Sequence, residues 1–274
     1  MGRPRRRRAK EPVIVAASLC VVAVLSGCSA ASSSSGASSA DPPAPTTVHS
    51  AVPSAAHPDG AALGFTVAGT RPVLPSGSQD THAQTPGASC DSATFAADRA
   101  LGARVARGFA LAGFPASADL LQHFLKGKGT DVDYRPGSLV SKKALASGAF
   151  RAVNNEVQDA ILGQLKAGRT RVRLSAAQLP TVAFESRSSD LYWGFRGTQG
   201  LTVTGSGRRE TGRYTGTLSY VIRDSYGFPV GDTLGGFGPP MRYLQTACGA
   251  PLHAGGARWF PDTITLTVPF SQPA

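Results

Sequence analysis

The sequence predicts an α+β fold, with N-terminal helices packed on a C-terminal antiparallel sheet. Two observations predict it. Between about residues 91 and 168, apolar side chains recur three and four positions apart, as in amphipathic helices. From about residue 170 the apolar period changes to two, as in strands that bury one face. Helices followed by antiparallel strands, without regular alternation of the two, define the α+β class.

Three helices are expected, each bounded by a capping residue or a glycine. The first follows Asp91 and ends at Gly113, the second begins at Ser117 and ends at Gly127, and the third ends at Gly168. Their apolar stripes are Leu101, Val105, Phe109 and Ala112; Leu120, Leu121, Phe124 and Leu125; and Val153, Val157, Ile161 and Leu165. We expect these stripes to face the core of the folded body.

The expected sheet centres on a long hairpin. Val182 and Phe184 alternate with polar neighbours and predict one strand, and residues 205–212, with Arg208 and Arg209, predict a turn region. Alternating arginines predict the polar face of another strand: Arg169, Arg171 and Arg173. The apolar faces of the hairpin and of the final strand are Tyr214, Gly216, Leu218, Tyr220 and Ile222, and Ile264, Leu266 and Val268.

The first 27 residues have the composition of an export signal. Six of the 28 basic residues lie within the first ten positions, and an apolar run at 12–25 is too short for a lasting membrane span. The run ends in Leu25-Ser26-Gly27-Cys28, which resembles the bacterial lipobox. The resemblance implies cleavage before Cys28, lipid on its sulfur, and a lipid anchor at the extracytoplasmic face of the cell membrane. An uncleaved membrane anchor with a chance cysteine is the alternative.

Charge does not predict a nucleic-acid partner once the signal is removed. The whole chain has a formal net charge of +11, but residues 28–274 carry 22 basic and 16 acidic residues. Those basic residues are scattered, which is typical of solvated faces rather than of a nucleic-acid site.

Residues 28–87 predict a lipidated, flexible tether, and residues 88–274 a single domain. Ser29 to Ala40 contain only Ser, Ala and Gly, and Pro-, Gly- and Ser-rich sequence continues to about Gly87. An apolar island at 63–67, with Phe65 and Val67, could be a strand that docks on the body. The sequence leaves this docking open.

Two cysteines remain once Cys28 is lipidated, namely Cys90 and Cys248. In an exported protein they most simply form a disulfide, with two free thiols as the alternative. A loop of that length would stabilise the fold by roughly 4–5 kcal/mol. His123 and His253 stand alone, so neither a metal site nor a cofactor is expected.

One candidate binding segment runs from Asp190 to Gln199. It places Tyr192 and Trp193 near Arg196 and Gln199, and aromatic faces beside amide and guanidinium donors suit sugar or peptide binding. The alternative is a strand whose aromatic rings belong to the core.

One candidate catalytic segment ends the long strand. Asp224, Tyr226 and Phe228 resemble the Asp-x-Tyr-Asp-Phe element of colicin-M-type toxins, which cleave the lipid-linked peptidoglycan precursor. Gly227 stands where that family has its next carboxylate, and the His-Arg pair expected a few residues later is absent. The resemblance implies catalytic roles for Asp224 and Tyr226. Separately, His253 follows Asp224 in the sequence and is the only plausible histidine for an acid–base role. The alternative is a turn in which Asp224 accepts backbone hydrogen bonds.

These features predict a lipid-anchored cell-envelope protein with a binding or structural role. The expected partners are the membrane, through lipid on Cys28, and a cell-wall glycan, peptide or protein. The sequence contains no nucleophile elbow, phosphate loop or HExxH motif. An envelope hydrolase that uses Asp224, Tyr226 and His253 is the alternative, and an inhibitor or immunity-like protein is a third.

Overall fold

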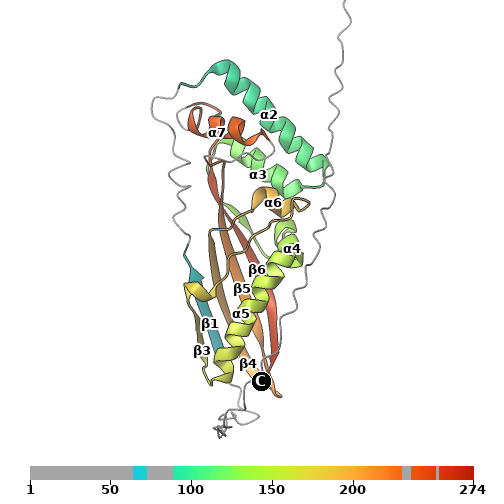
Figure 1. Ribbon diagram of the computed structural model, residues 1–274, viewed down its shortest axis with the longest axis vertical. Helices are drawn as coiled ribbons and strands as arrows, with labels where there is room; N and C mark the ends of the chain where they lie inside the picture. Colours follow the sequence, from blue (N-terminus) through green and yellow to red (C-terminus); the bar gives the residue numbers. More distant parts are fainter. Residues whose placement is uncertain (1–63, 73–88, 230–235, 251–252) are drawn as a thin grey trace, which may run out of the picture. The chain divides into compact units, whose positions relative to one another are not determined.

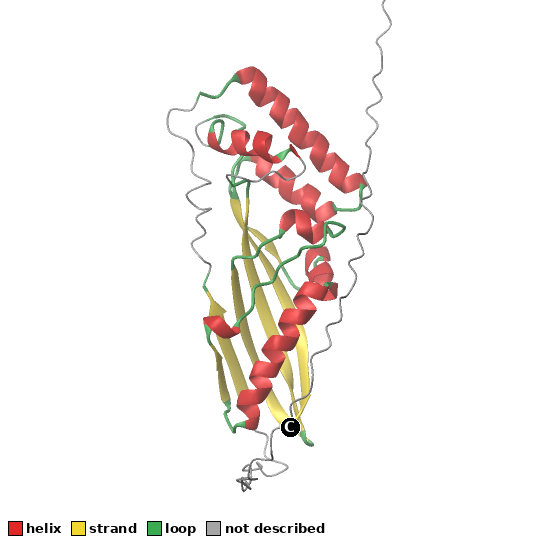
Figure 2. Cartoon of the chain, in the orientation of Figure 1, coloured by secondary structure: helices red, strands yellow, loops and turns green. Residues whose placement is uncertain are grey.

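The structure is a computed structural model that describes residues 64–72, 89–229, 236–250 and 253–274. All of them belong to one compact unit within residues 51–274. The expected export signal, Cys28 and most of the expected tether lie outside the described residues. The α+β class is confirmed: helices accompany a six-stranded sheet (Figures 1 and 2).

The elements follow one another with helices mostly before the long strands. In chain order they are β1 (Gly64–Arg71), α2 (Ser92–Leu111), α3 (Pro115–Lys126), β2 (Val132–Tyr134), α4 (Leu139–Ala146), α5 (Gly148–Lys166), β3 (Arg171–Leu174), the 3₁₀ turn η1 (Ala176–Gln178), α6 (Asp190–Gly194), β4 (Gly200–Glu210), β5 (Arg213–Tyr226), α7 (Gly238–Thr246) and β6 (Phe260–Pro273). In Figure 1, α2, α3, α6 and α7 gather around one end of the sheet, while α5 runs along it.

The three expected helices are confirmed as α2, α3 and α5. Asp91 caps α2 by accepting a hydrogen bond from the backbone N–H of Thr94. Gly127 ends α3 in the left-handed conformation that glycine adopts without strain. One expected cap is wrong, because α3 begins at Pro115 and Ser117 is buried inside it. Proline suits a first helical position because the N–H that it lacks has no partner there.

The sheet has the order β2-β6-β5-β4-β1-β3. The four central strands pair antiparallel, as the sequence predicts, but β2 and β3 add parallel to β6 and β1 at the two edges. A parallel pair needs a crossover connection. The short elements β2 and α4 carry too few residues to show a period, which explains why the sequence does not predict them.

The apolar island of the expected tether is a strand of the sheet. β1 pairs with β4 on one side and with β3 on the other. Phe65 and Val67 are buried on the helix-covered face, and Thr66 between them is exposed. The docking that the sequence leaves open is therefore real, and the sheet reaches back to Gly64.

The expected turn region at 205–212 is wrong, because most of it is strand. Residues as far as Glu210 belong to β4, and only Thr211 and Gly212 make the turn, both with positive φ. The glycines in this stretch make room for a ring: a Cβ at Gly207 would collide with Phe65, whose ring meets that of Phe270 at 5.6 Å. Glycine here serves packing rather than a turn.

The segment from 180 to 195 also differs from expectation. Val182 and Phe184 are buried, but only one isolated bridge, between Ala183 and Gly197, stands in place of the expected strand. β4 pairs with β1 on one side and with β5 on the other, so residues 182–184 find no free edge of β4 with which to pair. The strand that the alternative interpretation of residues 190–199 assumes is absent at its start, where Asp190–Gly194 form helix α6 and Ser189 caps its first turn.

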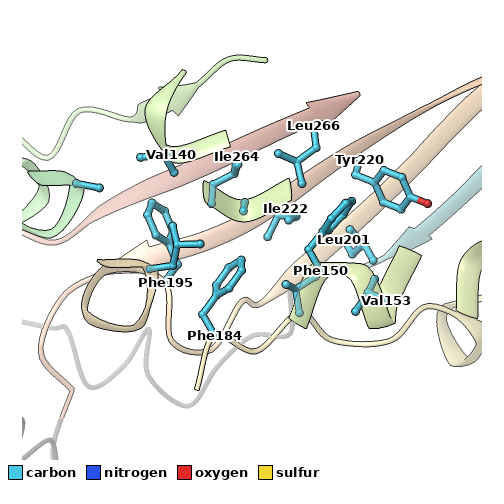
Figure 3. Packing of buried hydrophobic residues seen from close by; sticks show 14 of the residues in the cluster. Val140, Phe150, Val153, Phe184, Phe195, Leu201, Tyr220, Ile222, Ile264 and Leu266 are labelled. Carbon is cyan, nitrogen blue, oxygen red and sulfur yellow. The ribbon is translucent and has the colours of Figure 1, made fainter. Parts of the chain in front are cut away.

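The core lies between the sheet and the helices. Phe150 and Val153 of α5 and Val140 of α4 meet Ile222, Ile264 and Leu266 of the sheet (Figure 3). The hydroxyl of Tyr220 donates to Asn154 of α5 at 2.9 Å, so the polar tip of this buried ring is satisfied. The alternation expected for the long hairpin is confirmed by the buried side chains Tyr214, Leu218, Tyr220 and Ile222.

A disulfide joins Cys90, just before the cap of α2, to Cys248, just after α7, as the sequence predicts. Tyr243 of α7 reinforces this junction by accepting a hydrogen bond from the backbone N–H of Asp91 at 2.7 Å. Within the described ranges, no helix combines the length and apolar character that crossing a membrane requires.

Candidate functional site

Two carboxylates face each other on the helix-covered side of the sheet. Asp224 of β5 and Asp262 of β6 are direct cross-strand partners. Both occupy the same face as Ile222 and Ile264, which are buried in the core. Directly opposed residues of antiparallel strands have Cβ atoms about 4.5–5.5 Å apart. The two carboxylates are therefore immediate neighbours.

The two members of this carboxylate pair differ in their access to solvent and to hydrogen-bond donors. Asp262 is 1% exposed, and neither of its carboxylate oxygens has a hydrogen-bond partner among the described residues. Asp224 is partly exposed and accepts a hydrogen bond from the backbone N–H of Ser225 at 2.9 Å. An ionised carboxylate without donors is strongly disfavoured in a dry interior. Burial without donors therefore favours the protonated form of Asp262.

The electrostatics of the pair follow from this burial. Burial raises the pKa of Asp224 to about 7, although the hydrogen bond from Ser225 opposes the rise. Burial, and then the charge of Asp224, raise the pKa of Asp262 well above its ordinary value. Two interacting carboxyl groups titrate as a unit. The pair can therefore release or take up a proton close to neutral pH.

Aromatic rings follow the pair along the same face, toward the end of the sheet. Tyr226 and Phe260 stack with ring centroids 5.5 Å apart, and Phe124 of α3 meets Tyr226 edge-on at 6.1 Å. Tyr134 belongs to β2, the strand beside β6. Its pKa is raised by burial and then by the charges of Asp262, Asp119 and Asp190. Tyr134 therefore keeps its hydroxyl proton in the physiological range.

The electrostatics of the carboxylate pair suit proton transfer. A general acid works best when its pKa lies near the ambient pH. The pKa of Asp224, about 7, meets this condition. In the part of the chain that the structure describes, no group of three or more His, Cys, Asp or Glu side chains could hold a metal ion.

We expect the carboxylate pair to make the folded chain less stable as pH rises. A pKa that folding raises means that the folded state binds more protons, so stability falls from about pH 4 to beyond about pH 7. In Asp262→Asn this loss should shrink, because the amide does not titrate and the raised pKa of Asp262 no longer contributes to it. Urea unfolding measured across this pH range checks the difference.

The matched control is Asp133→Asn, which changes an exposed carboxylate on the neighbouring strand β2. Its stability should follow that of the parent chain at every pH. Parallel pH profiles for the parent chain and Asp262→Asn would contradict a protonated Asp262.

The structure places two of the expected catalytic residues on one strand and the third in a loop. Asp224 and Tyr226 share one face of β5, but Tyr226 is buried among Phe124, Phe228 and Phe260. His253 lies in the loop after α7, where its backbone N–H donates to Gly249 and its carbonyl accepts from Gly256.

The residue opposite Asp224 is Asp262, which the sequence reasoning missed. One signal could have found it, since Asp262 occupies a core position in the period-two series Phe260, Asp262, Ile264 and Leu266. A carboxylate on the apolar face of a strand is rare unless it is paired or functional.

The expected binding residues fall into two places. The indole Nε1 of Trp193 donates to the carbonyl of Arg187 at 3.1 Å, and the half-buried ring lies 5.5 Å from that of Phe109. Tyr192 is buried, and the exposed guanidinium of Arg196 lies 5.4 Å from its ring centroid. Gln199 instead accepts a hydrogen bond from Ser225 of β5 at 3.3 Å.

A second buried carboxylate, Asp190 of α6, holds three helices together. It accepts hydrogen bonds from the backbone N–H groups of Ala116 and Ser117 at 3.0 and 2.8 Å, and it forms an ion pair with Lys143 of α4 at 2.7 Å. Phe114, which precedes α3, offers no side-chain cap, so Asp190 satisfies the free N–H groups of that helix from a distance. Burial favours a raised pKa of Asp190, but these hydrogen bonds outweigh it and lower the pKa.

The chain was compared with protein-family models, with curated proteins and with solved structures. No protein-family model, no curated protein and no solved structure matches the chain.

Proposed function

We propose that the chain is an exported binding protein, held at the outer face of the cell membrane by lipid on Cys28. The observation that carries a binding role is the second face of the sheet. Along β1, β4, β5 and β6, side chains on one face are buried, while most of those on the other are exposed or half-buried and polar. Such a face is a wide, rigid surface on which a partner can lie.

The disulfide supports the proposed location. Disulfides persist in oxidising compartments outside the cytoplasm. Cys248 is fully buried and bonded to Cys90, so this bond belongs to the folded body. A structural disulfide and the resemblance of residues 25–28 to a lipobox point to the same compartment by independent routes.

We expect Cys28→Ser to move the protein from the membrane fraction to the medium, because serine lacks the thiol that accepts the lipid. Fractionation of cells that express each form checks the anchor. The released chain should then sediment with isolated cell envelopes, which checks binding. Retention of Cys28→Ser in membranes would contradict the anchor, and a chain that stays in the supernatant would contradict the binding role.

The alternative of an envelope hydrolase stays a prediction. The carboxylate pair favours it, because Asp224 is partly exposed and its pKa of about 7 suits a general acid. The hydroxyl of Tyr226 belongs to a residue that is only 6% exposed, which places the second expected group away from bulk solvent.

A further inference from the structure

The side of the sheet that no described helix covers carries a regular array of hydroxyl groups. Strand register places Thr66, Ser206 and Thr217 in one row across β1, β4 and β5. A second row holds Thr204, Ser219 and Thr267 across β4, β5 and β6. We name these two rows the hydroxyl face, and each of its side chains is exposed or half-buried, namely Thr66, Thr204, Ser206, Thr217, Ser219 and Thr267.

The spacing of this array is set by the backbone. Neighbouring strands lie about 4.8 Å apart, and alternate residues of one strand about 6.7 Å apart. Each hydroxyl can both donate and accept a hydrogen bond. Threonine side chains have few rotamers, so ordering them on a ligand costs little entropy. The face is therefore a preorganised grid of donors and acceptors.

An arginine stands at the β3 end of each row. Arg171 pairs in register with Thr66, and Arg173 pairs with Ala68, whose other neighbour is Thr204. Both arginines are exposed, and neither forms an ion pair with any described residue. They present guanidinium groups at the margin of the grid.

The charges of this side favour a negative ligand. Glu210 at the hairpin end is already engaged by Arg208, with 2.5 Å between Oε1 and Nε. Arg223 lies farther along β5 and donates to the hydroxyl of Thr202 at 2.7 Å. Asp133, the acidic residue of β2, belongs to the opposite edge from β3. Positive charge therefore predominates beside the two rows.

We propose that the hydroxyl face, with Arg171 and Arg173, binds an acidic polysaccharide. Guanidinium groups bind carboxylates and related anions through paired hydrogen bonds, and the grid matches the hydroxyls of sugar rings. A polysaccharide that lies along the second row from β3 to β6 crosses four strand intervals, about 19 Å. The inference rests on the proposed binding role and names its ligand class.

The test uses the full chain with Cys28→Ser, which removes the lipid, and fluorescently labelled polygalacturonate as the ligand. Anisotropy should show saturable binding that weakens as NaCl rises from about 0.05 to about 0.5 M, because salt screens exposed charges. Neutral dextran of equal length should bind at least about tenfold more weakly, since it lacks the carboxylates.

Matched variants separate this face from general charge. Arg171→Gln with Arg173→Gln should weaken binding of polygalacturonate by about fivefold to tenfold. Arg104→Gln with Arg151→Gln removes the same charge from exposed positions of α2 and α5 and should leave the affinity unchanged. Thr204→Val with Thr217→Val keeps the shape of the face and should weaken binding without changing its salt dependence.

Three results would overturn the inference: equal loss in both arginine pairs, equal binding of an oligothymidylate of similar charge, or no binding of polygalacturonate. The third result leaves the proposed function standing if the released chain still sediments with envelopes. If sedimentation also fails, the proposed function fails as well.

Discussion

Replacing Cys90 and Cys248 by alanine is expected to lower the free energy of unfolding by about 5 kcal/mol, because their disulfide spans 158 residues of sequence. The cross-link reduces the number of conformations open to the unfolded chain, so its removal raises the entropy of the unfolded state. Single domains are stable by only about 5–15 kcal/mol, so the variant should lie close to its unfolding threshold. Urea unfolding followed by far-ultraviolet circular dichroism measures the difference.

Reduction provides the control for this effect. A thiol reductant should destabilise the parent chain by a similar amount and leave the double alanine variant unchanged. The hydrogen bond between Asp91 and Tyr243 is available in both forms, so it does not contribute to the difference. A loss below about 1 kcal/mol would show that the unfolded chain is already compact without the bond.

Asp190→Ala is expected to cost about 3–5 kcal/mol, since it removes one partner of a buried charge pair and leaves groups without partners. Two backbone N–H groups at the start of α3 lose their acceptor, and Lys143 keeps a charge with its side chain only 31% exposed. The contacts of α3 with α4 and α6 should loosen together. Thermal and urea unfolding measure the loss.

Two further variants separate burial from capping. Asp91→Ala removes an exposed helix cap of the same residue type and should cost much less than Asp190→Ala. Lys143→Met in the Asp190→Ala background removes the stranded charge and should restore part of the stability. Equal losses for Asp91→Ala and Asp190→Ala would contradict the dominant role of the buried pair.

Periodic patterns predict those parts of this fold whose side chains alternate between core and solvent. The helical stripe through Val153, Val157 and Ile161 is buried as expected, and so is the period-two face through Leu218 and Tyr220. In both cases the local pattern and the tertiary packing favour the same structure, so the pattern suffices.

The pattern misleads where a distant residue decides the outcome. Gly205 and Gly207 read as turn signals, but the ring of Phe65, far away in sequence, fills the space over Gly207. Ser117 reads as a cap, yet Asp190 supplies the cap that α3 needs. Candidate sites are the hardest to predict, because only the register of β5 with β6 brings Asp224 opposite Asp262.

The place of β1 in the sheet has a consequence for the order of folding. Gly64–Arg71 precedes every other described element, yet its partners are β3 and, much later in the chain, β4. During synthesis, which proceeds from the N-terminus, this strand can pair with β3 only once residues 171–174 have been made, and with β4 only once residues 200–210 have been made. Such non-local pairing folds slowly and leaves apolar side chains such as Phe65 and Val67 open to aggregation. The sheet can therefore close only after most of the chain has emerged, which makes a chaperone for the waiting strand advantageous.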